Sequence, residues 1–140
     1  MKRIITNITG GLLLAVSIVP TLLSVVSCGQ QAADRDIAVA DSLSEAAPQR
    51  AMTLIDSLEG ESAMNKSRHM KLLLLKAKVR NKLAMPMSTD SQKDIADYFD
   101  KHGDSNERML AYYILGCAYQ RSQDAPMALQ YFHEAAAKAD

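Results

Sequence analysis

The sequence predicts an all-α fold built from about three antiparallel helix hairpins. Apolar residues recur at helical spacing through most of the chain, and no segment alternates apolar and polar residues between turn signals as a half-buried strand would. Of the 140 residues, 48% are hydrophobic, and the eight methionines and many alanines suit packing of helix on helix. A chain of this length is expected to hold one small domain.

The first 27 residues form the expected leader. Lys2 and Arg3 begin the chain, and residues 4–27 carry no charge. A basic start, an apolar stretch and small residues before a cut site indicate a secretory signal. The segment Leu-Ser-Val-Val-Ser followed by Cys28 resembles the lipobox of bacterial lipoproteins. This resemblance implies that residues 1–27 are removed and that Cys28 becomes the acylated first residue, which anchors the chain in a membrane.

An uncleaved transmembrane helix is the alternative for residues 4–27, because this stretch is long enough to cross a bilayer. It would be a poor spanning helix, since it holds Thr6, Asn7, Thr9, Gly10, Gly11 and Pro20. The residue after the cysteine is Gly29 and not the aspartate that retains enterobacterial lipoproteins in the inner membrane. The resemblance therefore favours the outer membrane of a bacterial envelope.

Residues 28–33 are expected to form a tether, and a helical domain is expected to cover residues 34–140. The first part of this domain, residues 34–60, is predicted to be a degenerate helix hairpin. Its first helix has apolar residues at helical spacing, namely Ile37, Ala40, Leu43 and Ala47. Pro48 opens the second helix and Gly60 follows its end, which is the favoured order of these two residues.

The middle part, residues 63–103, is predicted to be a divergent repeat of two helices. The first of these, 63–83, carries two apolar stripes, one of Met70, Leu73, Leu74 and Ala77 and one of Leu72, Val79 and Leu83. A helix with two apolar faces packs against neighbours on both sides. Thr89 and Gln92 predict a capping box for the second helix, which is expected to end at Gly103.

The last part, residues 104–140, has the most regular pattern. Asp104 and Glu107 predict a capping box for its first helix, and Asp124 and Pro126 predict the start of its second. One face of the first helix holds Tyr112, Leu115, Gly116 and Tyr119, and the second helix places Ala128, Phe132 and Ala135 in the same way. A mid-helix glycine costs about 1 kcal/mol relative to alanine, so we expect the two helices to approach closely at Gly116.

This terminal pattern resembles one tetratricopeptide repeat (TPR), a helix-turn-helix unit that stacks into α-solenoids. The stretches Ala40–Leu43, Lys101–Asp104 and Met109–Cys117 also resemble TPR proteins of the Bacteroidetes. The resemblance implies a short TPR-like α-solenoid that binds a protein or peptide and has no enzymatic activity and no cofactor. The chain stops as a repeat ends, without a polar capping helix, so we expect a truncated or minimal member that could self-associate through this end.

The resemblance also implies where a partner binds. TPR modules use a concave face lined by the first helix of each pair. In the middle unit this face would present Lys71, Leu74, Lys78, Asn81 and Lys82, and in the last unit Leu110, Tyr113, Cys117, Gln120 and Arg121. Ile114 stands where carboxylate-gripping repeats have asparagine, so a chaperone tail is not the expected ligand.

The predicted helix that contains Lys71 is unusually basic, with seven basic residues and no acid between Lys66 and Leu83. One interpretation is a positive stripe that captures an acidic peptide or an anionic membrane surface. Replacing Lys71, Lys78 and Lys82 with glutamate would then abolish capture without unfolding the domain. The alternative is a solvated face whose lysines pair with acids of neighbouring helices, such as Asp94, Asp97 and Asp100.

Other classes of function have little support in the sequence. The 16 basic and 16 acidic residues give a net charge of zero, so no nucleic-acid partner is expected. The histidines, His69, His102 and His133, do not have metal-ligand spacing. Cys117 has no acid–base neighbour in sequence and is expected to be a buried, inert thiol. We therefore expect no catalytic and no metal-binding residues.

The leading hypothesis is a lipid-anchored adaptor that recruits another protein of the bacterial envelope through its TPR-like helices. One alternative is the sensory front end of a TPR signalling protein. Another is a lipoprotein that captures a small ligand or glycan.

Overall fold

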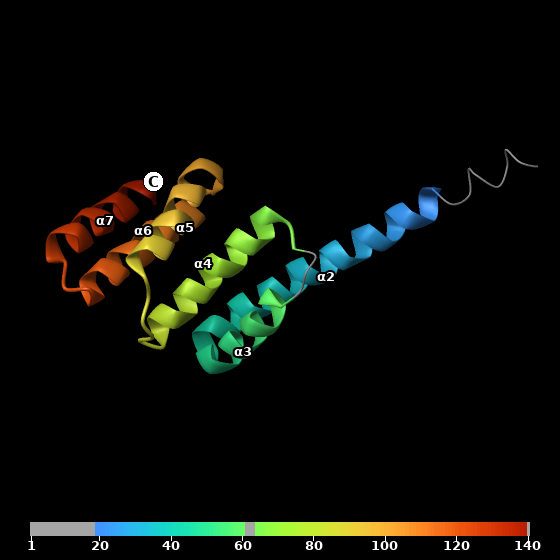
Figure 1. Ribbon diagram of the computed structural model, residues 1–140, viewed down its shortest axis with the longest axis horizontal. Helices are drawn as coiled ribbons and strands as arrows, with labels where there is room; N and C mark the ends of the chain where they lie inside the picture. The colour runs from blue at the N-terminus through green and yellow to red at the C-terminus, as the bar shows by residue number, and fades with distance from the viewer. Residues whose placement is uncertain (1–18, 61–63, 140) are drawn as a thin grey trace, which may run out of the picture. The chain divides into compact units, whose positions relative to one another are not determined.

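A computed structural model describes the chain at residues 19–60 and 64–139, with side chains from residue 31 onward except that of Ala33. These ranges contain α-helices and no strand, which confirms the predicted all-α class. The helices are α2 (Val19–Ala46), α3 (Pro48–Glu59), α4 (Lys66–Lys82), α5 (Thr89–His102), α6 (Ser105–Arg121) and α7 (Ala125–Lys138) (Figure 1). Of the described residues, 36–60 and 64–139 belong to one compact unit, and 19–35 belong to another.

The beginning of α2 differs from the sequence prediction. The sequence predicts a tether over residues 28–33 and a first helix from Asp34, whereas α2 already begins at Val19 and includes residues 28–33. No proline lies between Pro20 and the end of this helix, and glutamine and alanine follow Gly29, so nothing local stops it. Residues 1–18 of the predicted leader and the side chain of Cys28 lie outside the described residues.

Most helix starts follow the predicted local signals. Asp104 and Glu107 form the capping box of α6: the Asp104 carboxylate accepts the backbone N–H of Glu107 at 2.9 Å, and the Glu107 carboxylate accepts that of Asp104 at 3.1 Å. At α7, Asp124 accepts the backbone N–H of Met127 at 3.2 Å, and Pro126 lies in the first turn. The predicted capping box of α6 and the predicted N-cap and first-turn proline of α7 are confirmed.

The predicted cap of α5 is wrong by one residue. Ser88, and not Thr89, is the N-cap, and its hydroxyl accepts the backbone N–H of Ser91 at 3.4 Å. The Gln92 side chain consequently does not close a capping box, and it is buried on the inner side of α5. Gly103 follows α5 with an extended backbone, and a Cβ there would lie 2.8 Å from the carbonyl oxygen of Phe99.

Helix α4 separates two apolar clusters. The first cluster joins α2, α3 and one side of α4, and its buried members are Ala40, Ala51, Ile55, Leu58, Leu72, Leu75 and Val79. The second joins the other side of α4 to α5 and α6, with Leu74, Ile95, Ala96, Phe99, Ala111 and Leu115 buried and Tyr131 of α7 packed against it. The two predicted stripes of this helix thus serve two separate cores, and Figure 1 shows α4 between α3 and the group α5–α7.

Helices α6 and α7 approach closely at Gly116, as the sequence predicts. A Cβ built on Gly116 would lie 2.6 Å from two ring carbons of Phe132 and 3.3 Å from the carbonyl oxygen of Ala128. Ala128 and Ala135 are buried in the same contact. Tyr119 stacks on Tyr131 with ring centroids 5.3 Å apart, which fills the space beside it.

Candidate partner-binding surfaces

The residues predicted to face a partner lie on α4 and α6, and most of them reach the surface. Tyr113 is 45% exposed, and Lys71, Lys82, Gln120 and Arg121 are also exposed. Lys78, Asn81 and Leu110 are partly exposed. Leu74 is only 5% exposed and packs in the cluster shared by α4, α5 and α6, so it is not available to a partner. Cys117 is a free, buried thiol, as expected.

Two lysines of α4 are bound to α2. The Lys78 ammonium lies 3.0 Å from the Asp41 carboxylate and 3.2 Å from that of Glu45. Lys82 pairs with the Glu45 carboxylate and also donates to the Glu45 carbonyl oxygen at 2.9 Å. The hydrogen bond from Lys82, and then that from Lys78, lowers the pKa of Glu45 below its ordinary value. These contacts hold the C-terminal halves of α2 and α4 side by side.

Polar contacts at both ends join α4 to α6. Near the N-terminal ends, the Lys71 ammonium lies 2.9 Å from the Glu107 carboxylate. Near the C-terminal ends, the Arg121 guanidinium donates to the Asn81 carbonyl oxygen at 2.9 Å. Because the N-terminal half of each helix meets the N-terminal half of the other, and the last turn of each meets the last turn of the other, α4 and α6 run parallel.

For helices that are two apart in the chain order, the separation in sequence between contacting residues is similar in three pairs: α2–α4, α4–α6 and α5–α7. The Lys78–Asp41 and Lys82–Glu45 contacts from α4 to α2 each span 37 residues, and the Arg121–Asn81 contact from α6 to α4 spans 40. The Lys138–Asp100 pair, which joins α7 to α5, spans 38 residues. The pairs α2–α4, α4–α6 and α5–α7 are therefore matched at offsets of 36 to 40 residues, with Lys71–Glu107 as the contact that spans 36.

The acids that pair with the α4 lysines are not the predicted ones. The sequence points to α5, but Asp97 pairs with Lys93 of its own helix at 2.6 Å, and Asp100 pairs with Lys138. The partners lie on α2, α3 and α6: besides the pairs above, Lys76 lies 2.9 Å from Asp56 and 2.5 Å from Glu59. The reason is that α5 packs against the apolar side of α4, away from these lysines. The positive stripe is thus largely neutralised by the neighbouring helices.

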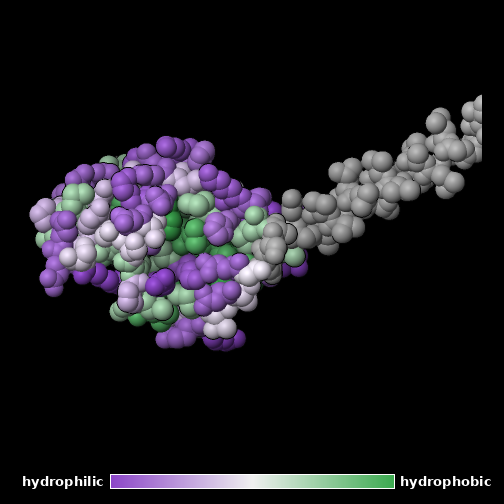
Figure 2. Space-filling view, viewed as in Figure 1, coloured by the Kyte–Doolittle hydropathy of each residue, from purple (hydrophilic) through white to green (hydrophobic). Residues whose placement is uncertain are grey.

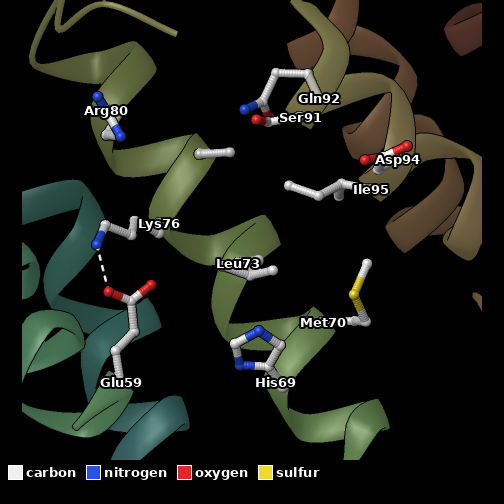
Figure 3. Close-up of a pocket in the computed structure, with 11 residues that line it drawn as sticks. Glu59, His69, Met70, Leu73, Lys76, Arg80, Ser91, Gln92, Asp94 and Ile95 are labelled. Atoms are coloured by element: carbon white, nitrogen blue, oxygen red, sulfur yellow. Dashed lines mark hydrogen bonds and ion pairs between the residues drawn. The ribbon is translucent and has the colours of Figure 1, made fainter. Parts of the chain in front are cut away.

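A groove lies between α3 and α5, with α4 as its floor, and sequence reasoning missed it (Figure 3). Its volume is about 460 Å³. Apolar side chains in the lining are Met70, Leu73, Ala77 and Ile95, and polar ones are Glu59, His69, Lys76, Arg80, Ser91, Gln92 and Asp94. Within the described residues, α3 and α5 make no backbone contact with each other, which leaves this side of α4 uncovered.

Gln92 is the unusual residue of this groove. Gln92 lies on the same helical stripe as Ile95, Ala96 and Phe99, and the residue as a whole is only 7% exposed. Its side-chain amide is not among the buried polar atoms without a partner that the described residues contain, so the amide is open to the groove. A polar residue on the buried stripe of α5 is the one sequence signal that could have pointed to this groove.

The two ends of the groove differ in charge. Arg80 donates to the Pro86 carbonyl oxygen at 2.7 Å, and its Nε is buried without a hydrogen-bond partner among the described residues. Figure 3 shows Ser91 and Gln92 at the Arg80 end, and Asp94 and Ile95 farther along toward Met70. The dashed line in Figure 3 marks the Lys76–Glu59 pair, which neutralises the α3 side of the rim.

No protein-family model matches the chain, and no curated protein or solved structure matches it significantly. Among residues 19–60 and 64–139, no helix combines the length and the low polarity that crossing a membrane requires. No three His, Cys, Asp or Glu side chains of these ranges gather closely enough to hold a metal ion.

Proposed function

We propose that this chain is a lipid-anchored adaptor of the bacterial envelope whose hairpins stack as a short TPR-like α-solenoid and bind another protein. The similar offset of 36 to 40 residues at the contacts of α2 with α4, α4 with α6 and α5 with α7 is the observation that supports this most. In a stack of helix-turn-helix units, equivalent helices of successive units lie parallel and in contact, so every such contact spans one repeat. Repeats of 20–45 residues are typical of solenoid proteins.

The partner is proposed to bind the face formed by α2, α4 and α6, centred on Tyr113. Aromatic and arginine side chains supply most hot-spot binding energy at protein interfaces. Tyr113 is the large apolar side chain that α6 leaves exposed, and Arg121 lies two turns farther along the same helix. The lysines of α4 contribute less to this proposal, because their ammonium groups are already held by acids of the chain itself.

Site-specific photocrosslinking in the source bacterium tests the partner-binding face. A photoreactive phenylalanine analogue replaces Tyr113 in the full chain, and a matched variant carries it at His133, which is exposed on α7. We expect one discrete crosslinked protein from position 113 that is absent from position 133. Identical products from the two positions, or none from position 113, would contradict a partner on this face.

Metabolic labelling with an alkyne analogue of palmitate tests the anchor. The wild-type chain is expected to take up the label and to sediment with membranes. The Cys28→Ala variant is expected to lose both, while Cys117→Ala keeps both because that thiol is buried. Labelling that persists in Cys28→Ala would show that this cysteine is not the acylated residue.

A further inference from the structure

We propose that two copies of this chain associate through the exposed face of α7, with Leu129 of each copy lying against Tyr113 and Phe132 of the other. This goes beyond the proposed function, because the occupant of the surface is a second copy and not another envelope protein. Tyr113 belongs to both surfaces, so association of two copies would cover the residue on which the proposed partner-binding face is centred.

The hairpins α4–α5 and α6–α7 are two copies of one structural unit. Helices α4 and α6 each have 17 residues, and α5 and α7 each have 14. The N-caps Asn65 and Asp104 are 39 positions apart, and so are Ala84 and Gln123, the left-handed residues after α4 and α6. The N-caps of α5 and α7 are 36 positions apart. Each residue of α4 therefore has an equivalent 39 positions later in α6, and each residue of α5 has one 36 positions later in α7.

The first of these units shows what covers its forward surface. Leu74 of α4 and Ala96 of α5 are only 5% and 1% exposed. Both belong to the cluster that also contains Ala111 and Leu115 of α6. The forward surface of this unit is therefore covered by a helix that presents an alanine followed four positions later by a leucine.

The equivalent surface of the second unit is open. The equivalents of Leu74 and Ala96 are Tyr113 and Phe132, whose ring centroids are 5.7 Å apart. Tyr113 is 45% exposed and Phe132 is partly exposed. A terminal unit of a solenoid normally has a polar outer face. The second unit instead exposes aromatic surface at the positions where the first unit packs against a helix.

The exposed face of α7 adds to this apolar surface. Seven residues of α7 are exposed, and none of them is Lys, Arg, Asp or Glu: Ala125, Pro126, Leu129, Gln130, His133, Ala136 and Ala137. Leu129 is 59% exposed. Its equivalent in α5 is Lys93, and the equivalent of Ala136 is Asp100, so charged residues of the first unit are replaced by apolar ones. Figure 2 shows hydrophilic residues over most of one face of the molecule, with the most hydrophobic residues mainly in a hollow, so a projecting leucine is unusual here.

A second copy can supply the missing helix, because α7 itself has the required pattern. Ala125 and Leu129 are exposed and have the same spacing of four as Ala111 and Leu115. A two-fold contact pairs the same surface on both molecules, and a face without charged residues meets its own copy without like-charge repulsion. Figure 1 shows α7 as the outermost helix on its side of α6, where a second molecule can reach it.

Analytical ultracentrifugation of the purified full chain in neutrally buoyant detergent micelles tests this association. The ratio of detergent to chain is varied, because chance occupancy of one micelle by two chains falls as detergent is added. We expect a dimer that persists in excess detergent. Leu129→Glu places two carboxylates in the two-fold contact and should raise the dimer Kd about tenfold or more.

Val39→Glu is the matched control, because it adds the same charge at another exposed apolar residue, on α2. The dimer Kd of this variant should equal that of the wild type. Leu129→Glu should melt like the dilute wild type, since more than half of Leu129 is already exposed. A wild type that is monomeric in excess detergent at every soluble concentration would overturn the proposal, and so would equal weakening of the dimer by both variants.

The outcome is independent of the proposed envelope partner, because no other protein is present in the ultracentrifuge. In the photocrosslinking experiment, an adduct of two copies is recognised by a mass twice that of one chain. Such an adduct supports association of two copies and is not counted as the partner.

Discussion

The close contact between α6 and α7 predicts an unusual response to the substitution Gly116→Ala. In an exposed helix this change would stabilise the protein by about 1 kcal/mol, because alanine is the better helix former. Here the new methyl group would lie 2.6 Å from two ring carbons of Phe132, so the ring or the whole of α7 must move. Overpacking of this kind costs about 1–3 kcal/mol. We expect a net loss of about 0–2 kcal/mol once both effects are combined, in place of the gain of about 1 kcal/mol.

The same reasoning predicts that the effect changes sign when the ring is removed. In a Phe132→Ala background the methyl group at position 116 meets no ring, and only the helix-propensity gain of about 1 kcal/mol remains. A double-mutant cycle should therefore give a coupling energy of about 1–3 kcal/mol between positions 116 and 132. Phe132→Ala alone is expected to be destabilising, since it leaves a gap between α6 and α7.

Urea unfolding of the four proteins, followed by circular dichroism at 222 nm, measures this coupling. A shift of 1 kcal/mol corresponds to about 4–8 °C in Tm for a domain near 100 residues, so thermal melts give an independent check. The reasoning is refuted if Gly116→Ala is more stable than the wild type by the full helix-propensity gain of about 1 kcal/mol. It is also refuted if the two substitutions prove additive, because the contact would then carry no energy.

Three further predictions concern the helix ends and the ion pairs. Gln123 has a left-handed backbone with φ of 64°, so Gln123→Gly should raise the free energy of unfolding in urea by about 0.5–1 kcal/mol. Ser122→Gly, next to it at a φ of −79°, should lower that free energy. Asp104→Ala should cost about 1 kcal/mol in the same assay through loss of the α6 cap, with Asp104→Asn as the variant that retains a cap. The pKa of Glu45 is lowered by the hydrogen bond from Lys82, so its contribution to stability is present above the ordinary value of 4.5 and is lost as the pH falls through the lower value in the folded protein. The stability difference between wild type and Glu45→Gln should accordingly shrink in acid melts below pH 4.5, and a difference that is constant with pH would contradict the assignment.

Local signals in the sequence are sufficient to predict where most helices begin and which faces they bury. A cap such as Asp104 depends on residues three positions away, and the α4 stripes depend on spacing within one helix. Such features do not require knowledge of the packing partner. The wrong N-cap at α5 also depends only on neighbouring residues. Ser88 directly precedes Thr89, and serine is the more favoured N-cap of the two.

Most features that depend on two helices at once could not be predicted, and the close approach of α6 and α7 is the exception, because the mid-helix Gly116 itself indicates it. Which acid meets Lys78 depends on how α4 is rotated relative to α2 and α5, and spacing within α4 does not contain that information. The groove likewise depends on the distance between α3 and α5, which are separated by the whole of α4. Gln92 shows the limit most clearly: its place on the buried stripe of α5 is visible in the sequence, but whether its amide is paired is not.

The ion pairs of α4 also change how a positive stripe can be tested. The sequence suggests charge reversal of Lys71, Lys78 and Lys82 as a change that spares the fold. In the folded chain, glutamate at these positions would face Glu107, Asp41 and Glu45, so like charges would oppose each other across two helix pairs. Loss of partner capture by that variant could then come from altered helix packing. Alanine at the same positions removes the attraction without adding repulsion, and since exposed pairs contribute about 0–1 kcal/mol each, the fold should survive it. Capture that is retained by the alanine variant and lost with Tyr113→Ala would place recognition on the aromatic side chain of α6.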